Sequence, residues 1–505
     1  MKTIKKTFPI NAALACVALL FVALLLSSCD KYLDRPPIGL IDEGMITTDP
    51  SITTVSSLAD AAYIPLSSTL NILGNWDWDN GLVIRNDFVM EDIASGDMLK
   101  KWAPDGDQVW MDQISTFNFT AVNPAFNGTW MYAFEGIARA NRAIAQLENE
   151  ALMTQIGMNT ALRNRLLGEM YFIRAFDYFG LVINYGDVPL LLKPFTNFNE
   201  IYEAAKRAPK EEVWRQINVD LDNAEGLLPA GKYSDTDARW RVSHGAVLAL
   251  QAKAALYNQQ WQTVVDKVTA LDQSGYYQLN ANYFDAFDVG KEFSENEVIF
   301  AYDHRPGLVP RRGNGLTALM GWGFIAPSED FLSEFEANDP RLAYTVDTEN
   351  RNVYKLLGAT NDGNKGNEDA PNNRIYIRWA DVLLWKAEAY NELGDYTEAI
   401  GIINEIRARA RTTPVLGGGT VPAGTLPDRN VAVTDKAQIQ QWIDHERRVE
   451  LGFEGHRFSD LRRWGTAKAV LTALGKNFQD RNYLYPIPQG EIDKSAGTIT
   501  QNQGY

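Results

Sequence analysis

Apolar residues recur at intervals of three and four along several stretches of this chain, the spacing of one face of an amphipathic helix. The stretches 125–148 and 160–182 both have this spacing, and the second is followed closely by glycine and proline, which end helices. A third helix is expected over 209–228, with proline and then acidic residues in its first turn. The pattern predicts a mainly helical protein.

Two later segments, 252–265 and 387–400, align with each other without a gap. In each, small residues precede a short polar turn, and an aromatic residue follows, Trp261 in one and Tyr396 in the other. This order resembles the tetratricopeptide helix–turn–helix, whose copies stack into a superhelical scaffold. Two unrelated helical hairpins are the alternative.

The stretch 283–375 differs from its surroundings, because it is rich in glycine, asparagine, aspartate and aromatic residues. Short β-like runs stand at 298–300 and 353–356. Turn-forming residues dominate 358–373 and 412–430, which we expect to be surface loops. The predicted fold class is mainly α: a tetratricopeptide-like helical-repeat scaffold with large irregular loop insertions and a few short β-strands.

The N-terminus has the layout of an export signal. Three lysines precede an apolar run over 10–26, and Ser27 and Ser28 stand directly before Cys29. This order resembles a bacterial lipobox, in which the cysteine thiol carries diacylglycerol and the cysteine becomes residue one after cleavage. A single transmembrane anchor is the alternative, since the run is about as long as the shortest bilayer spans.

We therefore divide the chain into three parts. Residues 1–28 are the expected lipoprotein signal peptide, and 29–50 the lipidated tether and entry segment. No linker rich in proline, serine or glycine divides 51–505, so we expect a single domain there, with its loop-rich insertion at about 283–375. No later segment is long and apolar enough to span a membrane.

Cysteine and histidine usage argues against catalysis and against a zinc site. Cys16 is lost with the signal and Cys29 carries the lipid, so the mature chain has no thiol for a disulfide, a nucleophile or a metal. The four histidines are isolated, and His445-Glu446 lacks the second histidine of a zinc protease. Nucleophile-elbow, phosphate-loop and dinucleotide-binding motifs are also missing. We expect no catalytic residue, no cofactor and no metal.

The carboxylates leave two alternatives. Asp87, Glu91, Asp92 and Asp97 are close enough in sequence to hold a hard cation, although their spacing is not that of an EF-hand. A pair of glycosidase carboxylates can come from any two points of a chain, so a glycoside hydrolase stays an alternative.

The formal net charge of −16 restricts the partners. Removing the three lysines of the signal makes the mature chain more acidic still, at −19. This charge argues against nucleic acid and against a position on anionic lipid. It is compatible with neutral ligands, which need contact surfaces other than charge.

Tryptophans in polar surroundings are the candidates for such a surface. Trp76 and Trp78 lie in a polar segment with Arg85 nearby, Trp102 follows two lysines, and Trp322 stands between two glycines. Neutral sugars have apolar faces and hydroxyl rims, so their sites combine aromatic platforms with polar side chains. The predicted ligand-binding residues are these four tryptophans and Arg85. Core packing is the alternative for any one tryptophan, and the tyrosines of 276–302 are the next place to look.

Two longer motifs stand out. The sequence GEMYFIRAFDYF at 168–179 runs into YGDVPL, and ERRVELGFEGHRFSDLRRWG at 446–465 precedes YPIP at 485–488. In the second motif, three pairs of opposite charges are three residues apart and would be neighbours on one helix face: Glu454/Arg457, Arg457/Asp460 and Asp460/Arg463. We interpret both motifs as structural, and the second as a partly buried network of ion pairs.

Together with the lipobox and the repeats, these motifs make the chain similar to the SusD/RagB family over nearly its whole mature length. The family comprises surface lipoproteins of Bacteroidetes nutrient-uptake systems. The resemblance implies an outer-membrane, surface-exposed lipoprotein that captures oligosaccharides and delivers them to a SusC-like TonB-dependent transporter. It implies a glycan site in about 75–110 and 300–325. A surface glycoside hydrolase and a peptide-uptake protein of the same family are the alternatives.

Overall fold

The computed structural model describes residues 50–195, 200, 204–233, 240–308 and 313–505. The expected signal peptide, Cys29 and nearly all of the tether lie outside these residues. None of the described helices combines the length and apolarity needed to cross a lipid bilayer.

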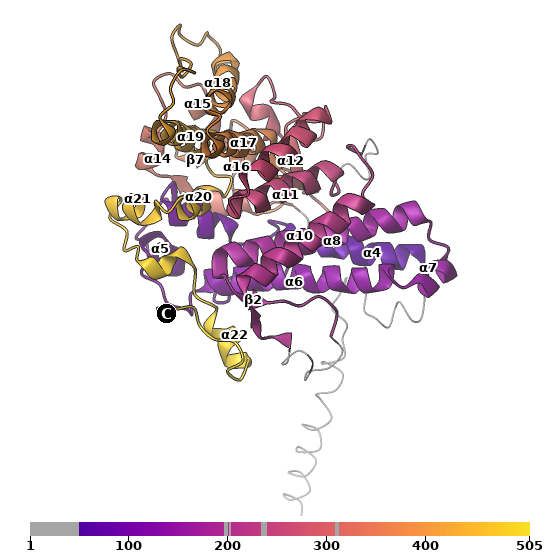
Figure 1. Cartoon of the computed structure of the whole chain (residues 1–505). Coiled ribbons are helices and arrows are strands. Elements are labelled where there is room, and N and C mark those ends of the chain that lie inside the picture. The colour runs from indigo at the N-terminus through magenta and orange to yellow at the C-terminus, as the bar shows by residue number, and fades with distance from the viewer. Residues whose placement is uncertain (1–49, 196–199, 201–203, 234–239, 309–312) are drawn as a thin grey trace, which may run out of the picture.

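Four helices of the N-terminal half pack together in the lower part of Figure 1. They are α4 (Ile52–Tyr63), α6 (Pro124–Leu147), α8 (Thr160–Tyr185) and α10 (Lys210–Leu227). The last three confirm the helices expected at 125–148, 160–182 and 209–228. Shorter helices connect them: η1 (Ile64–Leu66), η2 (Phe88–Ile93), α5 (Val109–Thr116) and α7 (Glu150–Ile156).

The two repeat-like segments are helical hairpins, as their sequences predict. The first consists of α11 (His244–Tyr257) and α12 (Trp261–Gln273), and the second of α17 (Trp379–Leu393) and α18 (Tyr396–Thr412). The aligned aromatic residues Trp261 and Tyr396 each begin the second helix. The hairpins stack because α12 packs on α17, and α19 (Lys436–Leu451) covers α17 and α18. Figure 1 shows this scaffold above the N-terminal helices.

Short elements fill the segment between the hairpins. They are η3 (Tyr283–Ala286), β4 (Val298–Tyr302), α13 (Leu316–Gly321), β5 (Ala326–Pro327), α14 (Glu329–Ser333), α15 (Arg341–Thr345), β6 (Val346–Asp347), β7 (Asn352–Val353), α16 (Tyr354–Leu357), η4 (Asp362–Asn364) and β8 (Arg374–Arg378). The β-like run at 298–300 is confirmed. The one at 353–356 is largely wrong, because the chain turns into α16 after Val353 and buries Lys355, Leu356 and Leu357.

The described strands pair only in twos, and all four pairs are antiparallel: β4 with β8, β6 with β7, β1 (Met98–Leu99) with β5, and β2 (Val188–Pro189) with β3 (Arg207–Ala208). The C-terminal region adds α20 (Arg457–Arg463), α21 (Ala467–Ala473), η5 (Asp480–Tyr483) and α22 (Gln489–Lys494). The predicted fold class, a helical-repeat scaffold with irregular insertions and few short strands, is confirmed.

The C-terminal motif is structural, but its ion pairs differ from those predicted. The helix stops at Leu451, and Gly452 lies so close to Phe331 that a Cβ there would be 2.4 Å from the ring. Since α20 begins only at Arg457, Glu454 and Arg457 do not share a helix. Of the three expected pairs, the structure forms only Asp460–Arg463, at 2.8 Å.

Glu450 is the centre of the network that forms instead. Its carboxylate is fully buried, lies 2.8 Å from Arg378 and 3.1 Å from Arg341, and also pairs with Arg409. Burial alone would raise the pKa of Glu450, but the three guanidinium groups outweigh burial and lower it. Arg378 also binds Glu454, at 2.6 Å, so the network joins β8 to the turn after α19.

His445 should make stability depend on pH. Its Nδ1 lies 2.7 Å from Glu334 and its Nε2 3.3 Å from Glu336. Burial opposes the charge on His445, but the two carboxylates outweigh it and raise the pKa of His445 to about 9. The contacts of protonated His445 with the two glutamates therefore stabilise the fold fully below pH ~6.5. This stabilisation is lost as the pH rises towards 9.

We expect the difference in free energy of unfolding between the wild type and His445→Gln to shrink from pH 6.5 to pH 9. Burial also gives Asp92 a pKa of about 8 and lowers that of Lys355 to about 8, so the wild type alone mixes several titrations. Urea denaturation of both proteins at each pH isolates the histidine, because the other groups cancel. A difference that does not change with pH would contradict the assignment.

Candidate functional site

The structure brings the predicted tryptophans together on one surface. The ring centroids of Trp76 and Trp322 are 6.0 Å apart, with the planes tilted by 46°. The ring of Trp78 is 6.4 Å from that of Trp322, at 63°. Trp76 is 47% exposed, Trp102 63% and Trp322 37%. Large exposed aromatic rings that gather from distant parts of a chain are typical of a binding surface.

The short pairing of β1 with β5 holds Trp102 beside this group. Leu99 pairs with Ala326, and the backbone N–H of Lys101 donates to the carbonyl oxygen of Gly323 at 2.8 Å. A Cβ on Gly323 would lie 2.6 Å from the Trp102 ring, and the φ of this residue is +89°. Only glycine combines that backbone conformation with so close an approach, which explains one of the two glycines that flank Trp322.

The loop between η1 and η2 supplies Trp76 and Trp78. Trp76 has a left-handed φ of 54°, and its N–H donates to Asn71 Oδ1 at 2.7 Å. Left-handed backbone at a non-glycine residue is uncommon and persists only where the surroundings fix it. Trp78 turns inward and packs on Phe324, with ring centroids 5.6 Å apart. Trp78 is therefore the support of the cluster, and Trp76 and Trp322 are its exposed faces.

Polar groups lie at the edge of the tryptophans. Asp77 binds the side-chain amide of Asn80 at 3.0 Å. The ammonium group of Lys101 lies 5.0 Å from the Trp102 ring centroid and donates to the carbonyl oxygen of Asn350 at 2.6 Å. Burial, with help from the charges of nearby Lys365 and Arg351, lowers the pKa of Lys101. Amide, carboxylate and ammonium groups around apolar rings suit a ligand that is rich in hydroxyl groups.

Arg85 does not reach this surface. Its side chain is only 8% exposed and donates to Asp87 at 2.7 Å and to the carbonyl oxygen of Pro65 at 3.1 Å. It also lies 3.8 Å from the buried carboxylate of Asp177. These partners make Arg85 part of the packing between the N-terminal helices, so it is not available to a ligand.

Sequence reasoning missed Phe324, Asn71 and Lys101. Lys101 is next to Trp102, and Phe324 is two residues from Trp322. This closeness in sequence to a predicted tryptophan was the only local signal for either residue. The orienting role of Asn71 depends on a turn that no sequence pattern indicated.

The acidic residues at 87–97 serve the fold. Asp97 binds Arg448 at 2.8 Å, Glu91 accepts from the hydroxyl of Ser459 at 2.7 Å, and Asp87 binds Arg85. Among the described residues, no group of three or more histidine, cysteine, aspartate or glutamate side chains is placed to hold a metal ion.

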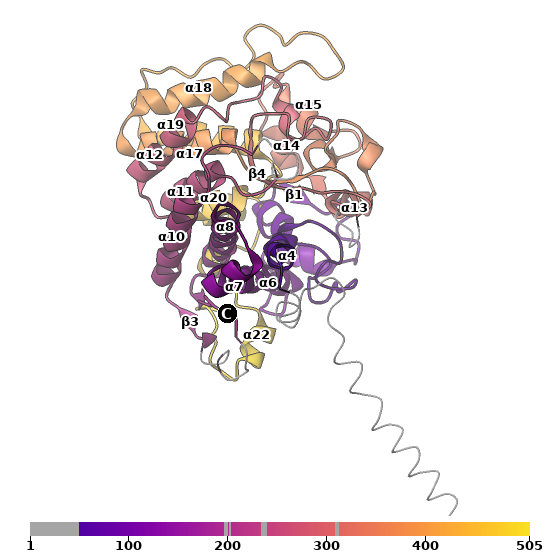
Figure 2. The ribbon, with the colours of Figure 1, turned by 90° about the vertical axis from the view of Figure 1, so that its right-hand side faces the viewer.

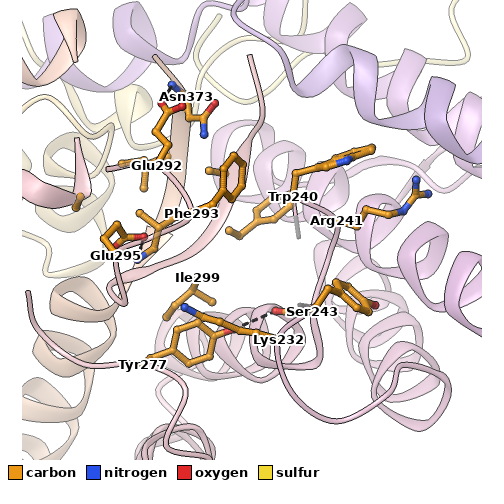
Figure 3. Close-up of a pocket in the computed structure, with 16 residues that line it drawn as sticks. Lys232, Trp240, Arg241, Ser243, Tyr277, Glu292, Phe293, Glu295, Ile299 and Asn373 are labelled. Atoms are coloured by element: carbon orange, nitrogen blue, oxygen red, sulfur yellow. Dashed lines mark hydrogen bonds between the residues drawn. The ribbon is translucent and has the colours of Figure 1, made fainter. Parts of the chain in front are cut away.

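A cavity of about 230 Å³ lies between the segment that precedes α11 and strand β4, and Figure 3 shows its lining. Tyr277, from the tyrosine segment named above, donates to or accepts from Ser243 across 3.1 Å, and the ammonium group of Lys232 lies 4.4 Å from the centroid of its ring. Arg241 in the same wall binds Glu169 at 2.6 Å. Its polar wall is therefore already engaged in contacts of the fold, unlike the exposed rings of the tryptophan cluster.

Two family profiles and several known proteins are similar to this chain. Residues 343–505 match the sequence profile of the SusD family, and residues 83–256 match a profile described as "Starch-binding associating with outer membrane". The chain is 26% identical over 448 residues to SusD-like protein P2 of Formosa agariphila, an alignment that covers 78% of this chain and 83% of that protein. Trp76, Trp78 and Trp322 fall outside both profile matches.

Solved structures share the fold. Surface glycan-binding protein A from Bacteroides fluxus has a TM-score of 0.71 at 24% identity and covers 90% of this chain and 100% of its own. Surface glycan-binding protein A from Bacteroides thetaiotaomicron, solved in complex with laminarihexaose, has a TM-score of 0.69 at 21% identity over 90% and 99% of the two chains. The profiles, the relative and the shared helical scaffold agree, and this chain belongs to the SusD/RagB family.

Proposed function

We propose that this protein binds neutral glycans at the cell surface and delivers them to a transporter. One observation carries the proposal: Trp76, Trp102 and Trp322 come from three separate segments and all stay substantially exposed on one surface. Keeping large rings in water is unfavourable unless a ligand covers them. Sugars do so with their C–H faces, while their hydroxyl groups reach the polar edge.

Charge and relatives support this proposal. A chain with a formal net charge of −16 repels polyanions, whereas a neutral glycan is indifferent to charge. One structural neighbour is a laminarin-binding SusD-like protein, and another was solved with laminarihexaose. The planes of Trp76 and Trp322 are tilted by 46°, so the two rings suit an oligosaccharide that bends across them better than a single flat ligand.

Binding and turnover should be measured together on the mature protein. Calorimetric titration with laminarin, soluble starch and other neutral polysaccharides should give saturable binding, and product analysis should show no release of shorter sugars. Release at enzyme-like rates that depends on one carboxylate would instead support a surface glycoside hydrolase. Binding of peptides with no binding of glycans would support the peptide-uptake alternative.

The anchor can be tested through Cys29. Metabolic labelling with palmitate should mark the wild type, and globomycin should block its processing. We expect Cys29→Ala to lose the label and to leave the outer membrane or to stall before cleavage. The matched control is Cys16→Ala, because that thiol lies within the segment removed by cleavage. A wild type that is unlabelled but still membrane-bound would mean that the apolar run is a true span.

Delivery requires a partner, since a tethered protein that only binds sugar does not import it. We propose that this partner is a SusC-like TonB-dependent barrel. Affinity purification from detergent-solubilised outer membranes should recover such a barrel with the lipoprotein. Repeated recovery of the lipoprotein alone, while other membrane complexes stay intact, would count against the partner.

A further inference from the structure

A second hollow, of about 360 Å³, lies on the helical scaffold. Its walls come from the end of α11 and the start of α12, from α17 and α19, and from the turn after α20. In Figure 2, α12 and α19 lie on the left of the molecule and α13, which leads into Trp322, on the right. We call this second hollow the scaffold pocket. It is separate from the tryptophan cluster.

Aromatic side chains line the scaffold pocket. Tyr257, Trp261 and Trp464 contribute to its wall, and each is partly exposed. Trp464 is held in place because its Nε1 donates to Glu388 at 2.9 Å and the guanidinium of Arg463 lies 4.7 Å from its ring centroid. Arg463 in turn binds Glu388 at 2.7 Å. The last residues of the C-terminal motif thus present a fixed ring to the hollow.

The charges of the pocket are balanced within the protein. Glu388 is paired with Arg463, Glu392 lies 2.8 Å from Lys436, and Asp444 is paired with Arg457. Every carboxylate of the wall is therefore paired with a cation, and the pocket places no demand on the charge of a ligand.

Side-chain amides complete the wall, and one of them lacks a partner. Gln440 Nε2 is buried and makes no hydrogen bond, while its Oε1 is 3.5 Å from the amide of Asn391. An unsatisfied buried donor costs free energy unless something in the pocket accepts its hydrogen. Gln259 and Gln441 stand exposed at the rim. Gln440 is therefore suited to a hydroxyl or ring oxygen in the hollow.

We propose that the scaffold pocket is a second glycan subsite that takes one or two neutral sugar units. Partly exposed rings, balanced charges and amides suit a neutral, hydroxyl-rich ligand better than an ion. The inference rests on the proposed function and extends it. Two sites on one protein hold a long polysaccharide more tightly than either site alone, without any new contact.

The experiment uses laminarin and soluble starch as probes, measured by affinity electrophoresis and calorimetry. Trp76→Ala/Trp322→Ala disables the first site, and we expect this double variant to keep weaker but measurable binding of a long chain. Adding Gln440→Met, or separately Trp261→Ala, should reduce that residual affinity at least tenfold. Loss of all binding in the double variant, or residual binding that neither change affects, would overturn the inference.

Gln440→Met also controls for folding. It keeps the length of the side chain and removes the donor without a partner. The long contact of Oε1 with Asn391 is lost too, but the Asn391 amide still donates to the carbonyl oxygen of Lys436 at 3.1 Å, so the melting temperature should hardly fall. A double variant that binds like the wild type would mean that the tryptophan cluster is not the first site. The effect of Gln440→Met and of Trp261→Ala on affinity would still test the scaffold pocket. Binding of neither probe by the wild type would remove the proposed function and this inference together. If Gln440→Met weakened only co-purification of the transporter, the occupant would be a protein segment and the inference wrong.

Discussion

Glu450→Gln is expected to lower the free energy of unfolding by roughly 3–5 kcal/mol, the cost of breaking a buried ion pair. The carboxylate of Glu450 neutralises Arg378, Arg341 and Arg409 in the interior. The amide removes that charge and leaves three buried guanidinium groups with less compensation. Urea denaturation followed by circular dichroism gives the shift in midpoint at unchanged slope.

The control is an exposed ion pair, and pH provides a second test. Lys468 and Asp480 lie 2.9 Å apart with most of the Asp480 side chain in water, so Asp480→Asn should leave the midpoint unchanged.

Since the pKa of Glu450 is lowered in the fold, the contribution of Glu450 to stability is present above pH ~4.5 and is lost as the pH falls. The difference between Glu450→Gln and the wild type should therefore narrow in acid. Equal midpoints at neutral pH would show that the network adds nothing to stability.

The helices could be predicted because their signals are local. Spacing along 125–148 and the paired aromatics Trp261 and Tyr396 depend only on neighbouring residues, and each led to the helix observed. The β-like run at 353–356 misled because its local β propensity competes with burial of Leu356 and Leu357, which favours a helical turn. Where tertiary packing favours a different conformation, it outweighs the local secondary-structure propensity.

The ion pairs could not be predicted, because their partners are distant in sequence. Glu450 and Arg378 are 72 residues apart, and the pairing of β4 with β8 brings Arg378 there. The tryptophan cluster was partly predictable, since rings in polar surroundings are conspicuous. The approach of Trp102 to Trp322 depends on the distant pairing of β1 with β5, which no pattern indicated. Arg85 was wrongly assigned because a charge near an aromatic segment says nothing about burial.

Trp76→Ala and Trp322→Ala are each expected to weaken glycan binding by about 2 kcal/mol, or roughly thirtyfold. Both rings lose stacking area that faces water, so no core cavity forms and the melting temperature should hardly change. Alanine at position 76 keeps the left-handed backbone strain already present with tryptophan, which leaves the ring as the only difference. Trp102→Ala should have a similar effect on affinity, because its ring is the most exposed of the three.

Trp78, Trp385 and Tyr276 separate a binding role from a structural one. Trp385 is fully buried, so Trp385→Ala should cost roughly 3–5 kcal/mol of stability. Trp78→Ala should lower stability and affinity together, because that ring supports Trp322. Tyr276 is 45% exposed outside the cluster, and Tyr276→Ala should change neither quantity. Removing an exposed ring that binds a sugar must lower the affinity. If the alanine variants of the exposed tryptophans were less stable but bound glycan as the wild type does, the glycan site would lie with the tyrosines of 276–302. The same would follow if only Tyr276→Ala weakened binding.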